Sequence, residues 1–108
     1  MRTTLNKKGM IKSIKTKALS EYWFKKKPMK LPKKAARKLQ RTLKQLDNIE
    51  TMSELKETFV LPGYNLQKYK EWGNNAWEVR VSGNWRLLFR FDSKSGHVTE
   101  IEYTDNTH

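Results

Sequence analysis

Residues 76–91 alternate between apolar and other side chains on both sides of a Gly-Asn pair, and this pattern limits the fold more than any other part of the chain. Alternation with a period of two predicts two strands, at 77–81 and 85–91, each with one apolar face. Opposed residues of an antiparallel pair point to the same side of a sheet, so both apolar faces must meet one core. The sequence therefore predicts a hairpin within an antiparallel sheet.

The register of this hairpin follows from matching its two apolar faces around a loop at 82–84. The faces coincide when three pairs form: Val81 with Trp85, Val79 with Leu87, and Trp77 with Phe89. Arg80 then lies directly opposite Arg86, where like charges cost about 0.2–1 kcal/mol. Such a pair suggests that an anion binds between the two arginines. An alternative is that Glu78, diagonal to both, pairs with one of them.

Around the hairpin, the periodicity predicts a short strand at 10–14, helices at 19–26, 32–46 and 51–58, a strand at 65–69, a polar loop at 71–75 and a last strand at 98–103. The middle helix has Ala36, Leu39, Leu43 and Leu46 on one face. Helices before an antiparallel meander predict an α+β domain, with that helix on the apolar face of the sheet. The other face, which carries the arginines, is expected to be open and basic.

The chain has 108 residues and no cysteine, which predicts one domain in a reducing compartment such as the cytoplasm. Its longest apolar run, 87–89, is far shorter than the roughly 20 residues of a membrane helix, so no membrane contact is expected. Met10 and Met1 are both candidates for the natural start. We expect residues 1–9 to be a flexible extension and residues 10–108 to form the domain.

Positive charge is concentrated in the first half of the chain. Residues 1–44 contain 16 Lys and Arg and one acid, whereas residues 45–108 contain seven basic and ten acidic residues. The predicted helix at 32–46 contributes Lys33, Lys34, Arg37, Lys38, Arg41 and Lys44. A solvated helix face is one interpretation of this set. The lack of compensating acids favours contact with nucleic acid, because neutralised phosphates release their counterions.

The second candidate site lies on the polar face of the sheet. It contains Arg80, Arg86 and Arg90 from the hairpin, with Gln67, Lys68 and Lys70 from the segment before it. A solubility face is the alternative. Trp77 and Trp85 have the parity of core residues, so Trp72 is the tryptophan expected to touch a base or a partner. No phosphate loop, metal-ligand spacing or nucleophile elbow is present, so we expect no metal and no cofactor.

Several segments resemble the HigB-type toxins of the RelE-like superfamily. They are Met10-Ile11-Lys12-Ser13, Leu61-Pro62-Gly63-Tyr64-x-Leu66, the hairpin Trp77-x-Val79-x-Val81-Ser82-Gly83-Asn84-Trp85-Arg86-x-x-Phe89-Arg90-Phe91, and Tyr103-x-Asp105. The resemblance implies a RelE-like fold and a ribosome-dependent endoribonuclease that cuts translated mRNA without a metal. In such enzymes the ribose 2'-hydroxyl attacks the adjacent phosphate. The implied partners are the ribosome, mRNA and a HigA-like helix-turn-helix antitoxin, with operator DNA bound only through the antitoxin.

The resemblance also implies roles for individual residues. Arg86 matches the family's phosphate-clamping arginine, Lys70 a basic active-site residue, and Asp105 the acid of the C-terminal motif. Two departures leave the general acid and base open: Gln67 stands where many HigB toxins have histidine, and the terminal histidine, His108, is displaced by one position. Glutamine exchanges no proton at neutral pH.

Two alternatives follow from these departures and from the charge. The first is a catalytically weak member of the family that binds RNA or the ribosome without cleavage. The second is a basic DNA-binding protein, which is disfavoured because the helical half shows no helix-turn-helix pair.

Overall fold

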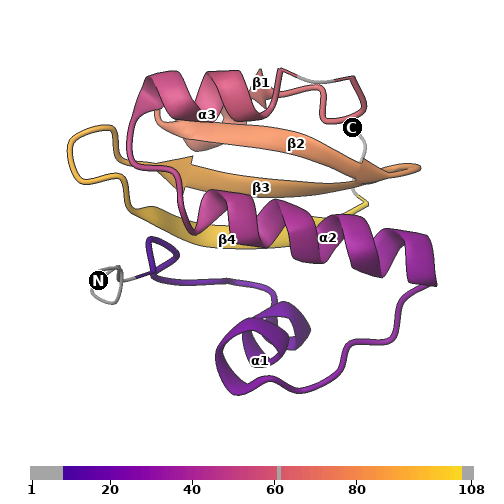
Figure 1. The fold of residues 1–108 in the computed structure, drawn as a ribbon. Coiled ribbons are helices and arrows are strands. Elements are labelled where there is room, and N and C mark those ends of the chain that lie inside the picture. The colour runs from indigo at the N-terminus through magenta and orange to yellow at the C-terminus, as the bar shows by residue number, and fades with distance from the viewer. Residues whose placement is uncertain (1–8, 61, 106–108) are drawn as a thin grey trace, which may run out of the picture.

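The computed structural model describes residues 9–60 and 62–105. The elements are α1 (Lys17–Lys25), α2 (Lys33–Leu46), α3 (Met52–Thr58), β1 (Gln67–Lys68), the 3-10 helix η2 (Lys70–Trp72), β2 (Ala76–Ser82), β3 (Trp85–Phe91) and β4 (Val98–Thr104). The strands form one antiparallel sheet in the order β1-β2-β3-β4, with α2 and α3 on one face (Figure 1). The predicted α+β class is confirmed. The predicted extension lies outside the described residues except for Gly9.

The longest helix, α2, packs its apolar stripe toward the sheet. Leu39, Leu43 and Leu46 are fully buried, as their spacing predicts. Ala36, expected on the same face, is only partly buried, and Ala35 occupies the buried position instead. The buried stripe therefore starts one residue earlier than predicted, and it follows the i, i+4 and i+7 spacing of a helix face from Ala35 onward.

The core fills the space between the helices and one face of the sheet. Its largest fully buried side chains come from all three helical regions and three strands: Leu19, Leu39, Leu43, Leu46, Leu55, Phe59, Val79, Val81, Leu87, Phe89, Phe91 and Ile101. This apolar layer covers the inner face of β2 and β3. No helix formed by the described residues is long and apolar enough to cross a membrane.

The segment before α1 lies alongside β4, far away in the sequence. Ile11 forms a parallel bridge with Val98, and Ile14 forms one with Ile101. Backbone hydrogen bonds support both bridges, such as the one that Lys12 N donates to the oxygen of Val98 at 2.8 Å. The predicted strand at 10–14 is thus reduced to two bridges, which still cover the free edge of β4.

The predicted hairpin register holds along most of β2 and β3. Two of the three predicted pairs form, Val79 with Leu87 and Trp77 with Phe89. Next to the turn the prediction is wrong, because a register shift between 80 and 82 pairs Ser82, instead of Val81, with Trp85. This bulge leaves Trp85 outside the core. Trp85 is 39% exposed and stacks on Tyr103, with ring centroids 4.7 Å apart.

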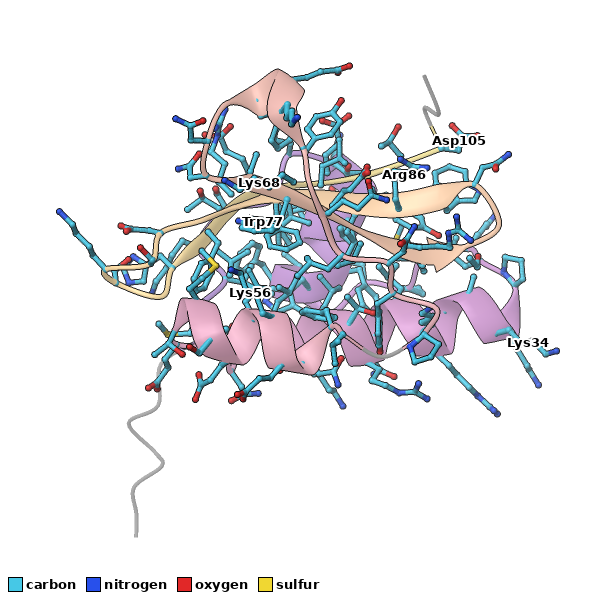
Figure 2. All side chains as sticks on the ribbon, turned by 90° about the horizontal axis from the view of Figure 1, so that it is seen from above. Lys34, Lys56, Lys68, Trp77, Arg86 and Asp105 are labelled. Atoms are coloured by element: carbon cyan, nitrogen blue, oxygen red, sulfur yellow. The ribbon has the colours of Figure 1, made fainter. Side chains whose placement is uncertain are left out.

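The outer face of the sheet, opposite the helices, is more covered than expected. Ala76 and Leu88 have the parity of this face and are nonetheless buried. Figure 2 shows the segment that contains η2 on the side of the strands away from α2 and α3. The predicted strand at 65–69 is shortened to β1 because Asn65 has a φ of 51°, which interrupts extended backbone. We call residues 69–75 the strap.

Candidate active site and nucleic-acid interface

Two arginines face each other on the outer face of the sheet, as the hairpin pattern predicts. Arg80 pairs with Arg86 in the register of β2 and β3. The carboxylate of Glu78 accepts a hydrogen bond from Nη1 of Arg86 at 2.7 Å. The side chains of Arg86 and Glu78 are 28% and 13% exposed. The alternative considered for Glu78 is therefore observed, and the ion pair offsets the repulsion between the arginines.

A small hollow surrounds this ion pair. Its lining residues come from the loop before β1 and from the first three strands: Asn65, Gln67, Glu78, Val79, Arg80 and Arg86. Gln67 pairs directly with Glu78 across β1 and β2. The hollow thus combines cations that can bind a phosphate with amide groups that can orient a nucleotide.

Arg80 lies in β2 beside the register shift between 80 and 82. Its side chain is exposed and also lines a groove of about 450 Å³ that includes Lys56, Pro62 and Leu66. The pKa of Lys38 is lowered mainly by burial, and further by the positive charges of Arg80 and Arg41. Arg80 therefore lies near Arg86 of the outer face and is also close enough to Lys38 of α2 to affect its pKa.

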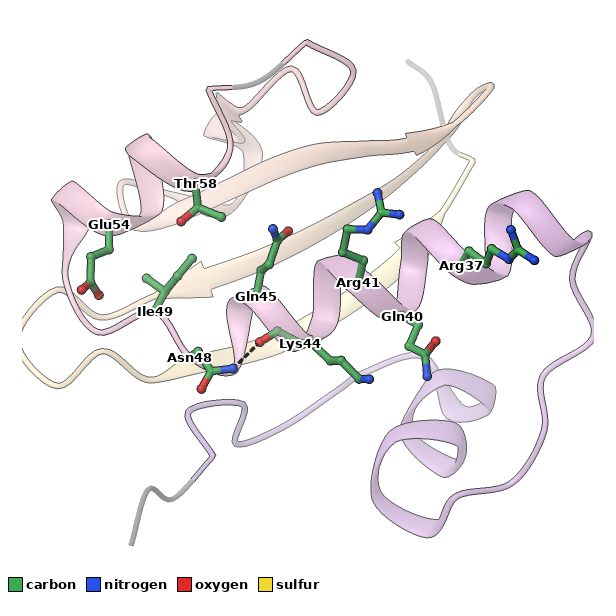
Figure 3. A pocket seen from close by; sticks show the side chains of 9 residues that line it. All are labelled: Arg37, Gln40, Arg41, Lys44, Gln45, Asn48, Ile49, Glu54 and Thr58. Atoms are coloured by element: carbon green, nitrogen blue, oxygen red, sulfur yellow. Dashed lines mark hydrogen bonds between the residues drawn. The ribbon is translucent and has the colours of Figure 1, made fainter. Parts of the chain in front are cut away.

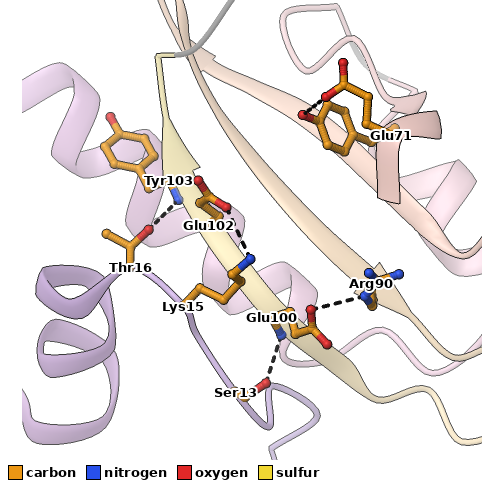
Figure 4. Close-up of polar contacts among 9 residues, drawn as sticks. Ser13, Lys15, Thr16, Glu71, Arg90, Glu100, Glu102 and Tyr103 are labelled. Atoms are coloured by element: carbon orange, nitrogen blue, oxygen red, sulfur yellow. Dashed lines mark hydrogen bonds and ion pairs between the residues drawn. The ribbon is translucent and has the colours of Figure 1, made fainter. Parts of the chain in front are cut away.

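Arg90 anchors the strap to the sheet. Its Nη1 donates to the carbonyl oxygen of Trp72 at 2.6 Å and to Oδ1 of Asn75 at 3.0 Å. Its Nε donates to Oε1 of Glu100 at 3.2 Å (Figure 4). The sequence predicted an RNA-facing cation at this position. In the structure, Arg90 instead donates hydrogen bonds to Trp72, Asn75 and Glu100 of the protein itself.

Trp72 is enclosed between two cations. The guanidinium of Arg90 lies 5.3 Å from the centroid of its ring, and Nζ of Lys15 lies 4.7 Å from it. Lys15 also approaches the carboxylate of Glu102 at 3.8 Å (Figure 4). Trp72 is partly buried, so the ring expected to meet a base packs between side chains of the sheet and the N-terminal segment.

The two lysines predicted beside the arginines lie in different places. Lys70 is exposed at the start of η2. The strap is anchored at Arg90, which is about 13 Å along β3 from Arg86 at the usual rise per residue. Lys68 pairs with Trp77, and its Nζ lies 5.5 Å from that ring. The prediction that Lys68 shares a face with Arg86 is wrong, because its register places it on the helix-covered side.

Tyr69 is a further polar group of the strap. Its hydroxyl donates to Glu71 at 2.7 Å. This hydrogen bond, with partial burial and the nearby carboxylates of Glu71, Glu102 and Glu78, raises the pKa of Tyr69 to about 12. Tyr69 therefore stays protonated at neutral pH and acts only as a neutral hydrogen-bonding group.

The C-terminal candidate residues lie at or beyond the end of β4. Thr104 pairs with Arg86, and Asp105 follows it, exposed and at the same end of the sheet as Arg86 (Figure 2). His108 lies outside the described residues. The structure thus places Asp105 near Arg86. The role of His108 stays a prediction.

The cations of α2 lie on the opposite side of the molecule. Arg37, Arg41 and Lys44 line a groove of about 680 Å³ between α2 and α3, together with Gln40, Gln45, Asn48, Ile49, Glu54 and Thr58 (Figure 3). Glu54 is the one acid among these lining residues. Lys33 and Lys34 are exposed at the start of α2. These five side chains form a basic surface suited to phosphates.

Lys38 differs from the other cations of α2. Its Nζ donates to the carbonyl oxygen of Gly63 at 2.8 Å and lies 4.7 Å from the centroid of the Tyr64 ring. Burial is also the main reason that its pKa is lowered. Lys38 therefore fastens the loop before β1 to α2, a use that its helical spacing does not reveal.

Comparison with known families identifies the protein class. A model described as RelE-like toxin of type II toxin-antitoxin system HigB matches residues 12–107. The chain belongs to this family. No curated protein matches it with significance. As a type II toxin, this HigB-like protein has a cognate antitoxin.

Sequence reasoning missed several polar residues of the HigB-like toxin. Lys56, Asn65 and Tyr69 lie near Arg80 or Glu78 in the structure, and Glu78 entered the prediction only as a possible ion-pair partner. Their contacts depend on loop and strap geometry, which has no periodic signal. Within the two described ranges, no group of three or more His, Cys, Asp or Glu is placed to hold a metal ion.

We expect Arg90→Met to loosen the strap of this HigB-like toxin while keeping the apolar stem of the side chain. The variant loses hydrogen bonds from a charged donor, so unfolding free energy should fall by about 1–3 kcal/mol. Urea denaturation measures this change. Hydrogen exchange at the amides of Trp72 and Gly73, which bond within the strap, should accelerate. Lys94→Met, in an exposed turn, is the control; equal stability of the two variants would contradict the anchoring role.

Proposed function

We propose that this HigB-like toxin is an endoribonuclease that cleaves translated mRNA on the ribosome. The observation that supports this best is the hollow on the outer face, which Arg80 and Arg86 line together with Glu78 and Gln67. Two neighbouring cations on a sheet that packs against the core are suited to hold a phosphate and to stabilise the charge that develops when it is attacked. Such a site can act on RNA by positioning and electrostatics alone.

In the proposed reaction, the 2'-hydroxyl of the substrate attacks the adjacent phosphorus and the bond to the 5'-oxygen breaks. The products are a 2',3'-cyclic phosphate and a 5'-hydroxyl end. Arg86 and Arg80 hold the scissile phosphate, since guanidinium groups bind phosphate oxygens through paired hydrogen bonds. Lys70 stabilises negative charge on the RNA, and Asp105 and His108 assist at the rim. No metal or cofactor takes part.

The basic surface of α2 is proposed to bind ribosomal RNA. It faces away from the hollow, so one surface can hold the ribosome while the other meets mRNA. Lys56 of α3 and Arg80 of β2 line one further groove, and Arg80 also lines the hollow. This arrangement allows the toxin to use sequence-independent phosphate contacts for docking and a separate, smaller site for cleavage.

The partner that neutralises the toxin is proposed to be a HigA-like antitoxin with a helix-turn-helix, and operator DNA is bound only through it. Because its substrate is mRNA on ribosomes, the toxin acts in the cytoplasm. Residues 10–108 form the toxin domain, preceded by a short extension.

Induction of the toxin without its antitoxin tests the proposed function. Primer extension on a translated message should show discrete cuts within codons, and these cuts should disappear when the message carries no ribosome-binding site. Co-expression of the antitoxin should abolish them. An intact message in growth-arrested cells would contradict cleavage.

A binding module without cleavage is the second candidate function. The observation in its favour is that Arg86, the proposed phosphate clamp, already has a carboxylate partner at 2.7 Å. In that case the toxin would sediment with ribosomes and inhibit translation while RNA stays uncut. The same primer extension, combined with sedimentation, distinguishes the two functions.

A further inference from the structure

The hollow around Arg86 contains one group suited to accept a proton at neutral pH. Its polar lining residues are two amides, two arginines and one carboxylate, that of Glu78. Amide side chains exchange no proton near neutral pH, and arginine remains protonated. A reaction that removes a proton in this hollow therefore depends on Glu78 or on a group brought from elsewhere.

Glu78 is also fixed in position. Its carboxylate is held by Nη1 of Arg86 at 2.7 Å, and its side chain is only 13% exposed. The bond to Nη1 occupies Oε1 of the carboxylate, and within residues 9–60 and 62–105 no hydrogen bond reaches its other oxygen. Arg86 retains its remaining N–H donors for a phosphate, because the guanidinium carries five of them in a planar fork.

We propose that Glu78 is the general base that removes the proton from the attacking 2'-hydroxyl, an inference that rests on the proposed endoribonuclease function. In RNA the 2'-oxygen lies next to the phosphate that it attacks. A base for this hydroxyl must therefore lie beside the phosphate clamp, and Glu78 contacts Arg86 directly. Geometry of this kind is the first requirement for a general base.

The 2'-hydroxyl transfers its proton to the carboxylate of Glu78 while the 2'-oxygen forms a bond to phosphorus. The bond between phosphorus and the 5'-oxygen breaks, and that oxygen takes a proton from solvent water. Glu78 then releases its proton to solvent, so no redox partner or co-reactant is needed.

Several charged and titratable groups face Glu78 from the surrounding elements. Arg80 and Arg86 flank it from β2 and β3. Tyr69 of the strap interacts electrostatically with Glu78 and with Glu102 of β4. The arginines keep their charge, and the raised pKa of Tyr69 keeps its hydroxyl protonated up to about pH 12. Near neutral pH, neither the arginines nor Tyr69 therefore gives up a proton in this hollow.

Single-turnover cleavage of translated mRNA by the full-length toxin in a reconstituted translation system tests this role. Glu78→Gln keeps a hydrogen-bond acceptor for Arg86 and removes the base, so we expect cleavage to slow by about 100-fold or more, with ribosome affinity unchanged. The matched control is Glu102→Gln, which neutralises a carboxylate of β4 and should cleave within threefold of the wild type.

A second substitution tests whether cleavage lost in Glu78→Gln can be recovered by another base. Gln67 is directly opposite Glu78 in the sheet, so Gln67→His in the Glu78→Gln background supplies an imidazole to the same hollow. We expect at least tenfold recovery. Cleavage by the double variant should rise with pH at about 6.5, the ordinary pKa of histidine, and the wild type, which lacks this imidazole, should not show that rise.

The outcomes separate this inference from the proposed function. If the wild type leaves mRNA intact, the endoribonuclease function is wrong and the role of Glu78 falls with it. If the wild type cleaves and Glu78→Gln cleaves equally well or faster, only the role of Glu78 is overturned. Lost cleavage that Gln67→His does not recover at any pH would show that Glu78 merely holds Arg86, and this too overturns the proposal.

Discussion

Replacing Arg86 with alanine is expected to reduce mRNA cleavage by about 100-fold or more while ribosome binding persists. Arg86 lies in the hollow where the scissile phosphate is proposed to bind, and a single well-placed donor in such a site contributes roughly this much to the rate. The basic surface of α2 lies on the other side of the sheet, so docking should not depend on Arg86. Single-turnover cleavage and sedimentation with ribosomes measure the two effects separately.

Arg86→Ala also leaves Glu78 without its ion-pair partner, so a conservative variant is needed. Arg86→Lys keeps a positive charge beside Glu78 but replaces the planar fork with a point charge. We expect it to fold with near wild-type stability and to cleave at least tenfold more slowly. Lys94→Ala, which removes a cation from an exposed turn, is the charge control. Full activity in folded Arg86→Ala and Arg86→Lys proteins would rule out the phosphate clamp.

Reversing two charges on α2 is expected to weaken ribosome binding strongly. Arg37 and Arg41 line the groove between α2 and α3, and each is proposed to neutralise an rRNA phosphate. In Arg37→Glu/Arg41→Glu, affinity at about 100 mM salt should fall by about 100-fold, and the slope of log affinity against log salt should become shallower by about 1.5. Equilibrium binding to purified ribosomes across a salt series measures both quantities.

Unfolding does not explain the expected loss in this variant. The reversed charges lie near lysines one turn away on α2, and opposite charges at that spacing stabilise a helix slightly. Lys94→Glu, a single reversal outside the groove, should change affinity by less than threefold. If the α2 variant bound ribosomes with wild-type affinity and salt slope, the docking role of this surface would be wrong.

The sequence predicts the sheet best where periodicity is strong. Val79 and Leu87 pair as expected because a one-residue slip would move a whole apolar face into solvent. The pattern does not reveal the bulge that places Ser82 opposite Trp85, since one extra residue beside a turn hardly changes the alternation of apolar residues. Trp85 was therefore predicted in the core and lies outside it.

Of the candidate site, the periodicity likewise predicts the strand register but not the loop contacts. The pairing of Arg80 with Arg86 follows from the register and is confirmed. The roles of Arg90 and Lys38 depend on which loop folds back over them, and each donates to a backbone carbonyl of such a loop. Loop geometry of this kind leaves no repeat in the sequence. Counting the cations along a strand or helix therefore overestimates the number that are available to bind RNA.

The most direct test of the central claim is the chemistry of the RNA ends in a reconstituted translation system. Purified toxin, ribosomes and a defined mRNA are combined, and the fragments are analysed for their terminal groups. Our account predicts cuts only in translated message, with a 2',3'-cyclic phosphate on one fragment and a 5'-hydroxyl on the other. Uncut mRNA on ribosomes saturated with toxin, or fragments with 5'-phosphate ends, would contradict it.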